Sequence, residues 1–190
     1  NNETSLSNGD GDDYFMYRGR EDARFVLLPY DLDTILGQGN TPGLANNGIF
    51  RATAIPALDR FLKWPEFASR YYGHLKQLID TTFSSAQLDV LLDQVLSRQV
   101  PPSVISEMKA FAAARRAHVL SLIPLKLSVA TEDLPVVDGS HQAPAPVIRL
   151  NGSGNAIETR AIRVNGVPAV WSAWEGKWTA PNVTFLPLSS

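Results

Sequence analysis

Two aspartates placed two residues apart, Asp31 and Asp33, are the side chains of this sequence whose spacing best suits chemistry. They directly follow an apolar run at residues 24–28, which predicts a β-strand. Residues two apart in an extended segment project to the same side, so the two carboxylates can meet at one hard cation. Mg²⁺ commonly takes one or two protein carboxylates together with phosphate oxygens. The pair therefore predicts a divalent-metal site, and phosphoryl transfer is a reaction that such a site serves.

A purely structural interpretation of these acids stays open. Asp33 can cap the first turn of a short helix over residues 34–36, a position where aspartate is preferred. Further upstream, residues 8–13 begin like a calcium loop, with oxygen-bearing side chains at alternate positions. Asp13 stands where the EF-hand pattern needs glycine, and Gly19 stands where it needs glutamate. A solvated acidic turn is therefore favoured for that segment.

Arginines close to the acids in sequence are candidates for phosphate binding. Arg18 and Arg24 are assigned this role because guanidinium groups bind phosphate through paired hydrogen bonds. Pairing with neighbouring acids at the surface is the alternative interpretation of both residues. The three histidines share no useful spacing, and the sequence contains no Walker A, serine-hydrolase or zinc-protease motif.

Composition limits the classes of function. The 190 residues include no cysteine, which excludes disulfides and zinc-thiolate sites. Their net charge is −2, which gives no electrostatic reason to expect nucleic-acid binding. No apolar run approaches the roughly 18–20 residues of a membrane span. Residues 1–50 hold eight acids and three arginines, whereas residues 51–125 hold nine basic and six acidic side chains. That asymmetry suits a metal site beside a phosphate-binding region, and it equally suits a solvated surface.

A β-hairpin is the element that must position the acids. Residues 14–17 form an aromatic run, residues 24–28 form the apolar run, and a polar turn joins the two predicted strands. Because the second strand is almost entirely apolar, we expect it to be buried on both faces. The glycines at positions 37, 39 and 43 then mark a flexible loop.

A helical block follows from residue 55 to Pro124. Pro56 and Pro65 each predict the start of a helix, and Pro124 ends the longest one. Ser84 and Gln87 form a capping-box pattern ahead of the third helix. We expect the apolar stripes of these helices to form a core, and they comprise Leu58, Phe61, Leu62, Phe67, Tyr71, Leu75, Leu78, Ile79, Leu88, Leu91, Leu92, Val95, Leu96, Val104, Met108, Phe111, Val119 and Leu122.

Residues 126–190 predict a small all-β module. Strands are expected at residues 147–150, 156–164, 169–171, 178–179 and 183–186. A type I′ turn is expected at residues 165–166 because their Asn-Gly pair tolerates positive φ, and a second tight turn is expected at residues 175–176.

Three tryptophans, Trp171, Trp174 and Trp178, lie close together in this module. A role in the core is favoured over an exposed platform that stacks on sugars, because a module of this size needs large side chains for stability.

The segment from residue 12 to residue 37 resembles the core of CotH-type (spore coat protein H) atypical kinases. The likeness lies in the aromatic run Tyr14-Phe15-Met16-Tyr17-Arg18 and in the run Arg24-Phe25-Val26-Leu27-Leu28-Pro29-Tyr30-Asp31-Leu32-Asp33. The leucine pattern of the helical block is similar as well, so the resemblance extends over residues 1–123. Tyr30 stands where the family often has tryptophan.

The resemblance implies an α+β chain. Residues 1–125 would be the C-terminal part of an atypical protein-kinase-like fold, with the metal-loop region in residues 1–50 and the helical block in residues 51–125. Residues 126–190 would be an incomplete Ig-like or other β-sandwich module. We expect the ATP-gripping lobe to lie upstream, and the 190-residue piece by itself to be inactive.

The resemblance also implies chemistry. It implies ATP, Mg²⁺ or another divalent cation, and transfer of the γ-phosphoryl group to Ser or Thr hydroxyls of a protein substrate. Asp31 would bind metal as the DFG aspartate of ordinary kinases does, and Asp33 would be a second metal ligand. Glu3 would stand at the position of the catalytic base, where the family usually offers aspartate. No nucleic acid or membrane span is expected, and the family points to the exterior of a bacterial cell.

A different class of function remains open. The chain can belong to a non-catalytic surface or adhesion protein that keeps the kinase-like scaffold and binds Ca²⁺ or a partner. Glu3 in place of aspartate and the appended β module favour this alternative.

Overall fold

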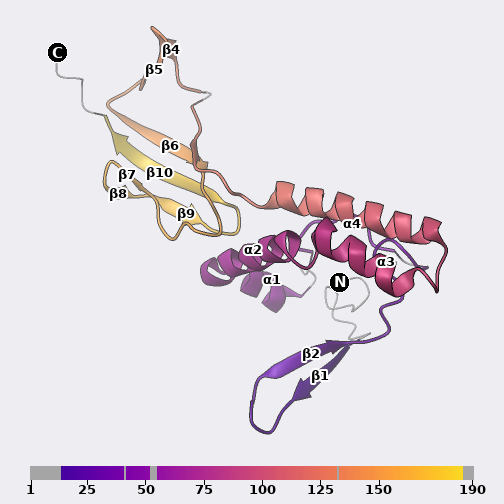
Figure 1. The fold of residues 1–190 in the computed structure, drawn as a ribbon. Coiled ribbons are helices and arrows are strands. Elements are labelled where there is room, and N and C mark those ends of the chain that lie inside the picture. The colour runs from indigo at the N-terminus through magenta and orange to yellow at the C-terminus, as the bar shows by residue number, and fades with distance from the viewer. Residues whose placement is uncertain (1–13, 41, 52–54, 132, 186–190) are drawn as a thin grey trace. The chain divides into compact units, whose positions relative to one another are not determined.

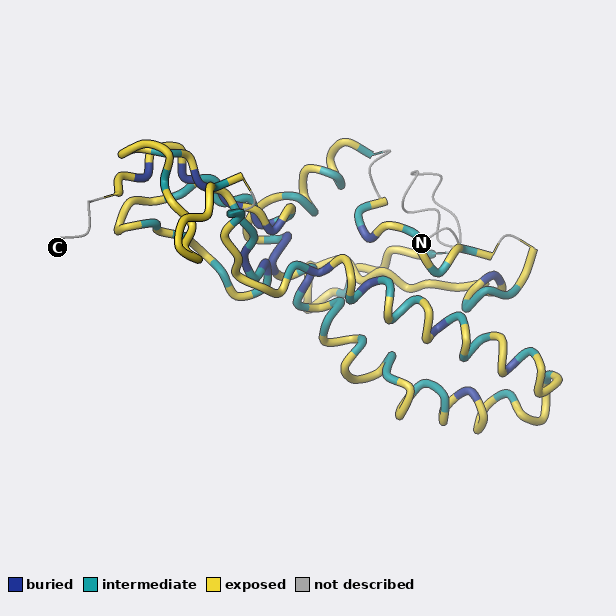
Figure 2. Tube along the Cα trace, turned by 90° about the horizontal axis from the view of Figure 1, so that it is seen from above, coloured by how far each residue is buried: buried dark blue, intermediate teal, exposed yellow. Residues whose placement is uncertain are grey.

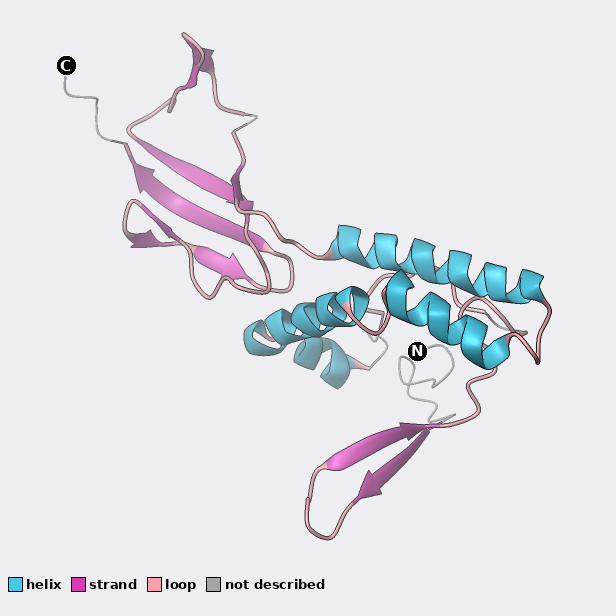
Figure 3. Cartoon of the chain, viewed as in Figure 1, coloured by secondary structure: helices cyan, strands magenta, loops and turns pink. Residues whose placement is uncertain are grey.

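Residues 14–40, 42–51, 55–131 and 133–185 are described by the computed structural model of the chain, shown as a ribbon in Figure 1 and by secondary structure in Figure 3. Helices and sheets occupy separate stretches of the sequence, which confirms the predicted α+β class. No described helix combines the length and the apolar character that a membrane crossing requires.

Contacts divide the chain into two compact units. The hairpin–helix unit takes the described part of residues 1–61 together with residues 74–122. The β unit takes residues 62–73 together with the described part of residues 123–190. Each unit has its own interior and is described separately.

An antiparallel hairpin opens the described chain, as predicted. Strand β1 (Tyr14–Arg18) pairs with β2 (Phe25–Pro29), in a register that runs from Tyr14 opposite Pro29 to Arg18 opposite Phe25. The expectation that the second strand is buried is wrong, because all five residues of β2 are exposed and Phe25 is 62% exposed. Pairing satisfies the backbone of a two-stranded sheet, but these exposures show that no described element covers its faces.

The helical block begins and ends where the prolines predict. The helices are α1 (Pro56–Lys63), α2 (Pro65–Asp80), α3 (Val90–Leu96) and α4 (Pro102–Leu122). A short π-helical segment, η2 (Ser85–Asp89), leads into α3. Proline suits the first helical position because its missing N–H has no partner there, which accounts for the starts of α1, α2 and α4.

The predicted capping box at Ser84 is wrong. The Ser84 side chain makes no capping hydrogen bond, and its backbone carbonyl instead accepts from the amides of Gln87 and Leu88 at 3.2 and 2.8 Å. The wider π-helical turn alters the spacing that a capping box requires.

The core of the helical block is smaller than the apolar stripes suggest. In α4 the buried residues are Ile105, Ala112 and Val119, whereas no residue of α1 is buried. In Figure 2 the helical turns of the tube carry many exposed residues, coloured yellow, and few buried ones. Five expected core residues are exposed, namely Phe61, Leu78, Leu91, Val95 and Leu122. Periodicity marks an apolar face, but it does not show whether a neighbouring element covers that face.

The β unit contains one four-stranded antiparallel sheet and two small hairpins. The sheet has the order β3-β6-β10-β9, formed by β3 (Ser128–Val129), β6 (Val147–Ser153), β10 (Lys177–Thr184) and β9 (Val170–Ser172). The hairpins are β4 (Val136–Val137) with β5 (Ser140–His141), and β7 (Arg163–Val164) with β8 (Val167–Pro168).

Three of the predicted strands need correction. Residues 156–158 form a turn, because the Asn155 side-chain oxygen accepts hydrogen bonds from the amides of Ile157 and Glu158 at 3.0 and 3.2 Å. Such Asx turns compete with extended backbone. Residues 178–179 and 183–184 belong to one strand, β10, whose pairing with β6 shifts register between Ala180 and Val183.

Trp178 lies in the core of the β unit, as the favoured interpretation predicts. It is 3% exposed, packs with Leu150, Ala180 and Val183, and donates its indole N–H to the carbonyls of Ser128 and Ser153. Trp171 and Trp174 are only partly buried.

The predicted turns of the β unit are confirmed. The first central residue of the β7–β8 turn has φ 50° and the second has φ 80°, as a type I′ turn requires. Gly176, with φ 62°, ends the short loop between β9 and β10.

Residues 62–73 join the β unit through Tyr72. This side chain is 3% exposed, and its hydroxyl donates a hydrogen bond to the Trp174 carbonyl at 2.6 Å. The Lys63 ammonium lies 4.7 Å from the centroid of the Trp174 ring, within the range of cation–π attraction. The first half of α2 therefore packs as part of the β unit.

Burial, together with a smaller effect of nearby Tyr71, raises the pKa of Tyr72 to about 12. In the unfolded chain the phenol titrates near 10, so above that pH the unfolded state loses a proton that the folded state keeps. The contribution of Tyr72 to stability is therefore complete below pH 10 and is lost as the pH rises towards about 12. Tyr72→Phe should cost about 1 kcal/mol at pH 7 and flatten the fall in Tm between pH 10 and 12. Thermal melts across this range measure both effects, and Tyr17→Phe, on the exposed face of β1, is the control. Equal pH dependence in the two variants would contradict the assignment.

Candidate functional site

The loop that carries Asp31 and Asp33 begins at an aromatic contact. Tyr30 stacks on Phe15 of β1, with 4.6 Å between ring centroids and 21° between ring planes. This contact holds the chain against the hairpin at the residue before Asp31. The loop therefore leaves the hairpin at a defined place.

Asp31 does not continue the strand. Its φ is 50°, in the left-handed region, which aspartate enters more readily than most residues. Strand alternation therefore does not set the directions of the Asp31 and Asp33 side chains. The prediction that the backbone is extended at Asp31 is wrong. The chain turns at the first acid instead.

The residues after Asp33 fold back on themselves. Thr34 is buried at 9% exposure, and a Cβ atom on Gly39 would overlap the Thr34 methyl and would lie 2.8 Å from the Asp33 carbonyl oxygen. The Gln38 amide donates to the Ile35 carbonyl at 3.0 Å. Residues 34–36 form a bend and a turn, so the alternative in which Asp33 caps a helix there is wrong.

Helix α4 anchors the far end of this loop. Gly37 has φ 78°, and a Cβ atom at this position would lie 2.7 Å from the Phe111 ring. Beside it, the Gln38 side-chain amide donates to the Glu107 carboxylate at 3.4 Å. Only glycine fits this combination of backbone angle and close approach.

The next loop is fixed to the same helix by Arg115. Its guanidinium donates to the carbonyl of Ala45 at 3.1 Å and also to the carbonyl of Asn47. A guanidinium that binds two loop carbonyls holds the backbone more firmly than a single contact. Both loops that follow the hairpin are thus attached to α4.

Both carboxylates of the pair lie at the surface. Asp31 and Asp33 are exposed, and neither has a hydrogen-bond or ion-pair partner among the described residues. No group of three or more His, Asp or Glu side chains with metal-binding spacing occurs in the described ranges. The protein therefore offers two hard oxygen donors here, a set that suits Mg²⁺ when phosphate and water complete the coordination. Glu3 lies outside the described residues.

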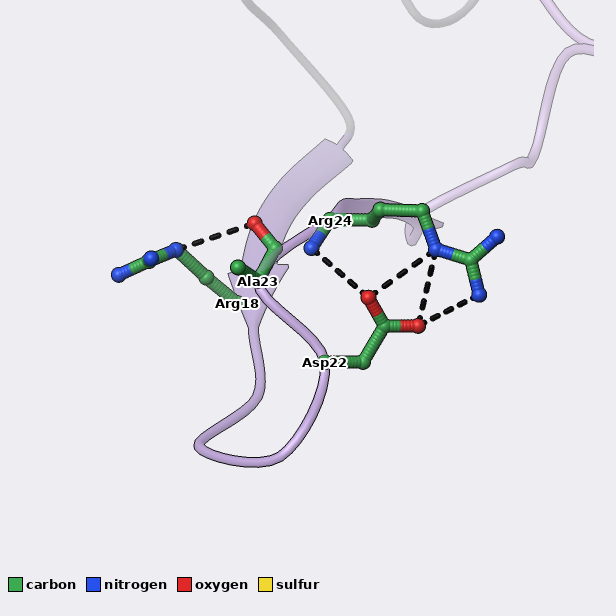
Figure 4. A network of polar contacts seen from close by, with 4 residues as sticks. All are labelled: Arg18, Asp22, Ala23 and Arg24. Atoms are coloured by element: carbon green, nitrogen blue, oxygen red, sulfur yellow. Dashed lines mark hydrogen bonds and ion pairs between the residues drawn. The ribbon is translucent and has the colours of Figure 1, made fainter.

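The structure does not bring Arg18 and Arg24 to the acids. Arg18 pairs with Phe25 at the turn end of the hairpin, about 13 Å along the strands from the Tyr14–Pro29 end. Arg18 donates to the Ala23 carbonyl at 3.0 Å. Arg24 and Asp22 form a bidentate ion pair with a shortest distance of 2.6 Å, and the hydrogen bonds from Arg24 lower the pKa of Asp22 (Figure 4). For Arg24, pairing with a neighbouring acid is thus what the structure shows.

Sequence patterns do not identify the residues that position the loop. They assign Gly37 to a flexible loop and Phe111 to a core stripe. The sequence gives only a weak signal that Gly37 contacts Phe111, because the contact depends on which face of α4 the loop packs against. The described site thus belongs to a mixed helix-and-sheet protein that presents a paired-aspartate loop on a helical block.

Comparison with models of protein families identifies the family of this chain. The model of the family described as "CotH kinase protein" matches residues 2–112, which is more than half of the sequence. The chain therefore belongs to the CotH kinase family, as the resemblance predicts. The match includes the hairpin and the acid loop and ends inside α4, beside Phe111. Comparisons with curated proteins and with solved structures gave no significant match.

Replacement of Gly37 by alanine tests the anchor on α4. The added Cβ atom meets both a left-handed backbone and the Phe111 ring, so Gly37→Ala should lower the free energy of unfolding by about 2 kcal/mol or more. Gly139→Ala is the matched control, because Gly139 has φ 77° and a Cβ atom added there would have no other atom within 4 Å. Its cost should be about 1 kcal/mol, from backbone strain alone. Denaturant unfolding measures both values.

A second variant separates a steric clash from general destabilisation. Adding Phe111→Ala to Gly37→Ala removes the ring that the new methyl meets, so the two costs should be less than additive. Additive losses, or equal losses for the two single glycine variants, would show that the Phe111 contact does not hold the loop.

Proposed function

We propose that the protein is an ATP- and Mg²⁺-dependent phosphotransferase that acts on Ser or Thr hydroxyls of a protein substrate. Membership of the CotH kinase family indicates a kinase-like function. The acid loop is the observation that supports the proposed dependence on ATP and Mg²⁺. It carries two exposed carboxylates that have no partner among the described residues, and it is attached to the hairpin and to α4. A kinase-like scaffold for the first part of the chain, and a sandwich for the β unit, belong to the same proposal.

Asp31 and Asp33 would hold the metal. Two carboxylates two positions apart in a loop repel each other where they approach, and a divalent cation relieves that repulsion. When bound, Mg²⁺ would supply the positive charge that offsets the negative charge of the phosphates during phosphoryl transfer. The task of the chain is positioning, which supplies much of the catalysis in this reaction class. The stacking of Tyr30 and the packing of Gly37 supply that positioning on the two sides of the acids.

Three further residues keep proposed roles. Glu3 would accept the proton of the substrate hydroxyl, as its place in the family pattern implies. Arg18 and Arg24 would contact nucleotide phosphate, and Arg24 would first have to exchange Asp22 for it. That exchange is accessible because the ion pair is exposed, and exposed pairs contribute little to stability.

A non-catalytic surface protein remains the second candidate, and the hairpin favours it. Phe15 and Tyr17 share one face of the hairpin with their partners Leu28 and Val26, and all four are exposed, by 60%, 60%, 46% and 51%. Contiguous exposed apolar side chains are typical of protein-binding surfaces. The paired acids fit Ca²⁺ less well than Mg²⁺, because Ca²⁺ takes 6–8 oxygen ligands.

Nucleotide binding by the full-length protein distinguishes the two candidates. Mg²⁺ with ATP at about 100 times the dissociation constant should raise the Tm by about 5–10 °C, because ligand binds only the native state. Asp31→Asn and Asp33→Asn should abolish most of this rise and reduce phosphoryl transfer to protein by about 100-fold or more. Glu21→Gln is the control, since it removes an exposed carboxylate in the turn of the same hairpin that takes no part in the proposed site. Unchanged melting of the wild-type protein with Mg²⁺ and ATP, or full transfer activity in both acid variants, would refute the proposal.

A further inference from the structure

The β unit contains a polar cleft that shares no residue with the acid loop. The cleft has a volume of about 340 Å³ and lies between the first turns of α2 and the residues that follow β6 and form β9. This volume is near the lower end of the roughly 300–1,000 Å³ typical of small-molecule sites. It therefore suits a single ring-sized group rather than a nucleotide.

Two guanidinium groups line this cleft from opposite parts of the sequence. Arg70 comes from α2, and it has no hydrogen-bond or ion-pair partner among the described residues. Arg160 follows the Asx turn, and one of its terminal nitrogens donates to the Ile157 carbonyl at 2.7 Å. That bond fixes the side chain while other N–H groups of Arg160 remain for a ligand. The pair predicts an anion, since guanidinium groups bind carboxylate and phosphate through paired hydrogen bonds.

A third charge in the same cleft sets the kind of anion. Glu66 lines the cleft beside the arginines, so the lining carries two positive charges and one negative charge. Because Glu66 cancels one of the two positive charges, the lining has a net charge of +1, which a carboxylate monoanion neutralises and a phosphate dianion exceeds. A carboxylate that carries hydroxyl groups nearby fits better, because Glu66 accepts hydrogen bonds from hydroxyls and Thr159 donates or accepts them.

An aromatic wall completes the cleft. Trp171 of β9 is partly exposed, and its indole is backed by Gly154, where a Cβ atom would lie 3.0 Å from the ring. Across the strands, Trp171 lies opposite the buried Trp178. The indole is therefore held in place before any ligand arrives, and a rigid aromatic side chain gives a ring of carbon atoms a large apolar contact at little entropic cost.

We propose that this cleft binds the ring of an acidic sugar, namely a hexuronate residue of a polysaccharide or glycan. The carboxylate lies between Arg70 and Arg160, the ring packs against Trp171, and the ring hydroxyls bond to Glu66 and Thr159. Neither the acid loop nor nucleotide enters this assignment, so it stands or fails independently of the phosphotransferase proposal.

Calorimetric titration of the purified protein with trigalacturonate tests the proposal, with neutral galactotriose as the comparison ligand. Trigalacturonate should bind at least tenfold more tightly than galactotriose, and added salt should weaken it because the interaction is ionic. Arg70→Gln and Arg160→Gln should each weaken binding by about tenfold or more, the loss expected for a hydrogen bond to a charged group. Arg163→Gln is the matched control, since Arg163 is exposed on β7 and outside the cleft lining, and it should leave affinity unchanged.

Four results would overturn this assignment. They are absence of trigalacturonate binding at millimolar concentration, equal affinity for the neutral trisaccharide, unchanged affinity in both cleft variants, and tighter binding of inorganic phosphate than of trigalacturonate. Unchanged Tm values for the variants show that a loss of affinity does not come from unfolding. Trp171→Phe replaces the indole with a smaller aromatic ring. It should weaken the binding of both trigalacturonate and galactotriose, rather than of trigalacturonate alone.

Discussion

The packing of Gly37 against the Phe111 ring is the contact on which the acid loop depends. In the segment that leads to this contact the backbone departs from ordinary conformations, since Asp31 and Leu36 have φ values near 50°. Left-handed backbone at residues other than glycine costs about 1–3 kcal/mol each and persists only where surrounding structure holds it. The ring of α4 supplies that restraint at one end of the loop, and stacking of Tyr30 supplies it at the other. The two aspartates therefore occupy a segment whose shape is set by tertiary contacts.

Sequence rules predict well the features that depend on neighbouring residues. The hairpin, the starts of α1 and α2 at proline and the Asn165–Gly166 turn follow from backbone preferences within a few positions. Rules fail where a distant element decides the outcome. β2 reads as a buried strand but is exposed, because apolar composition does not show whether anything covers it. The same limit explains Leu91 and Val95, which belong to an apolar stripe and yet are more than half exposed.

Competition at short range accounts for the other differences between sequence and structure. The carboxylate of Asp22 lies two residues from Arg24 and forms an ion pair with it. The prediction that Arg24 binds phosphate does not take this local competitor into account. Asn155 similarly captures two amides of the segment expected to be a strand. The position of the paired acids is predictable, since they follow a strand directly. Their geometry is not, because the left-handed turn at Asp31 replaces the extended backbone from which a common direction is inferred.

Exposure explains why two like charges can occupy one short loop. In water the repulsion between neighbouring carboxylates is small, about 1 kcal/mol at 4 Å, so exposed Asp31 and Asp33 need no partner for the fold to be stable. An unanchored loop would sample many arrangements of the two groups, and it would lose conformational entropy when a cation drew them together. The anchors at Tyr30 and Gly37 limit the arrangements of the loop before binding. Restraint of this kind lowers the entropic cost of capturing a cation, and it is the physical link between the packing of α4 and the chemistry proposed for the loop.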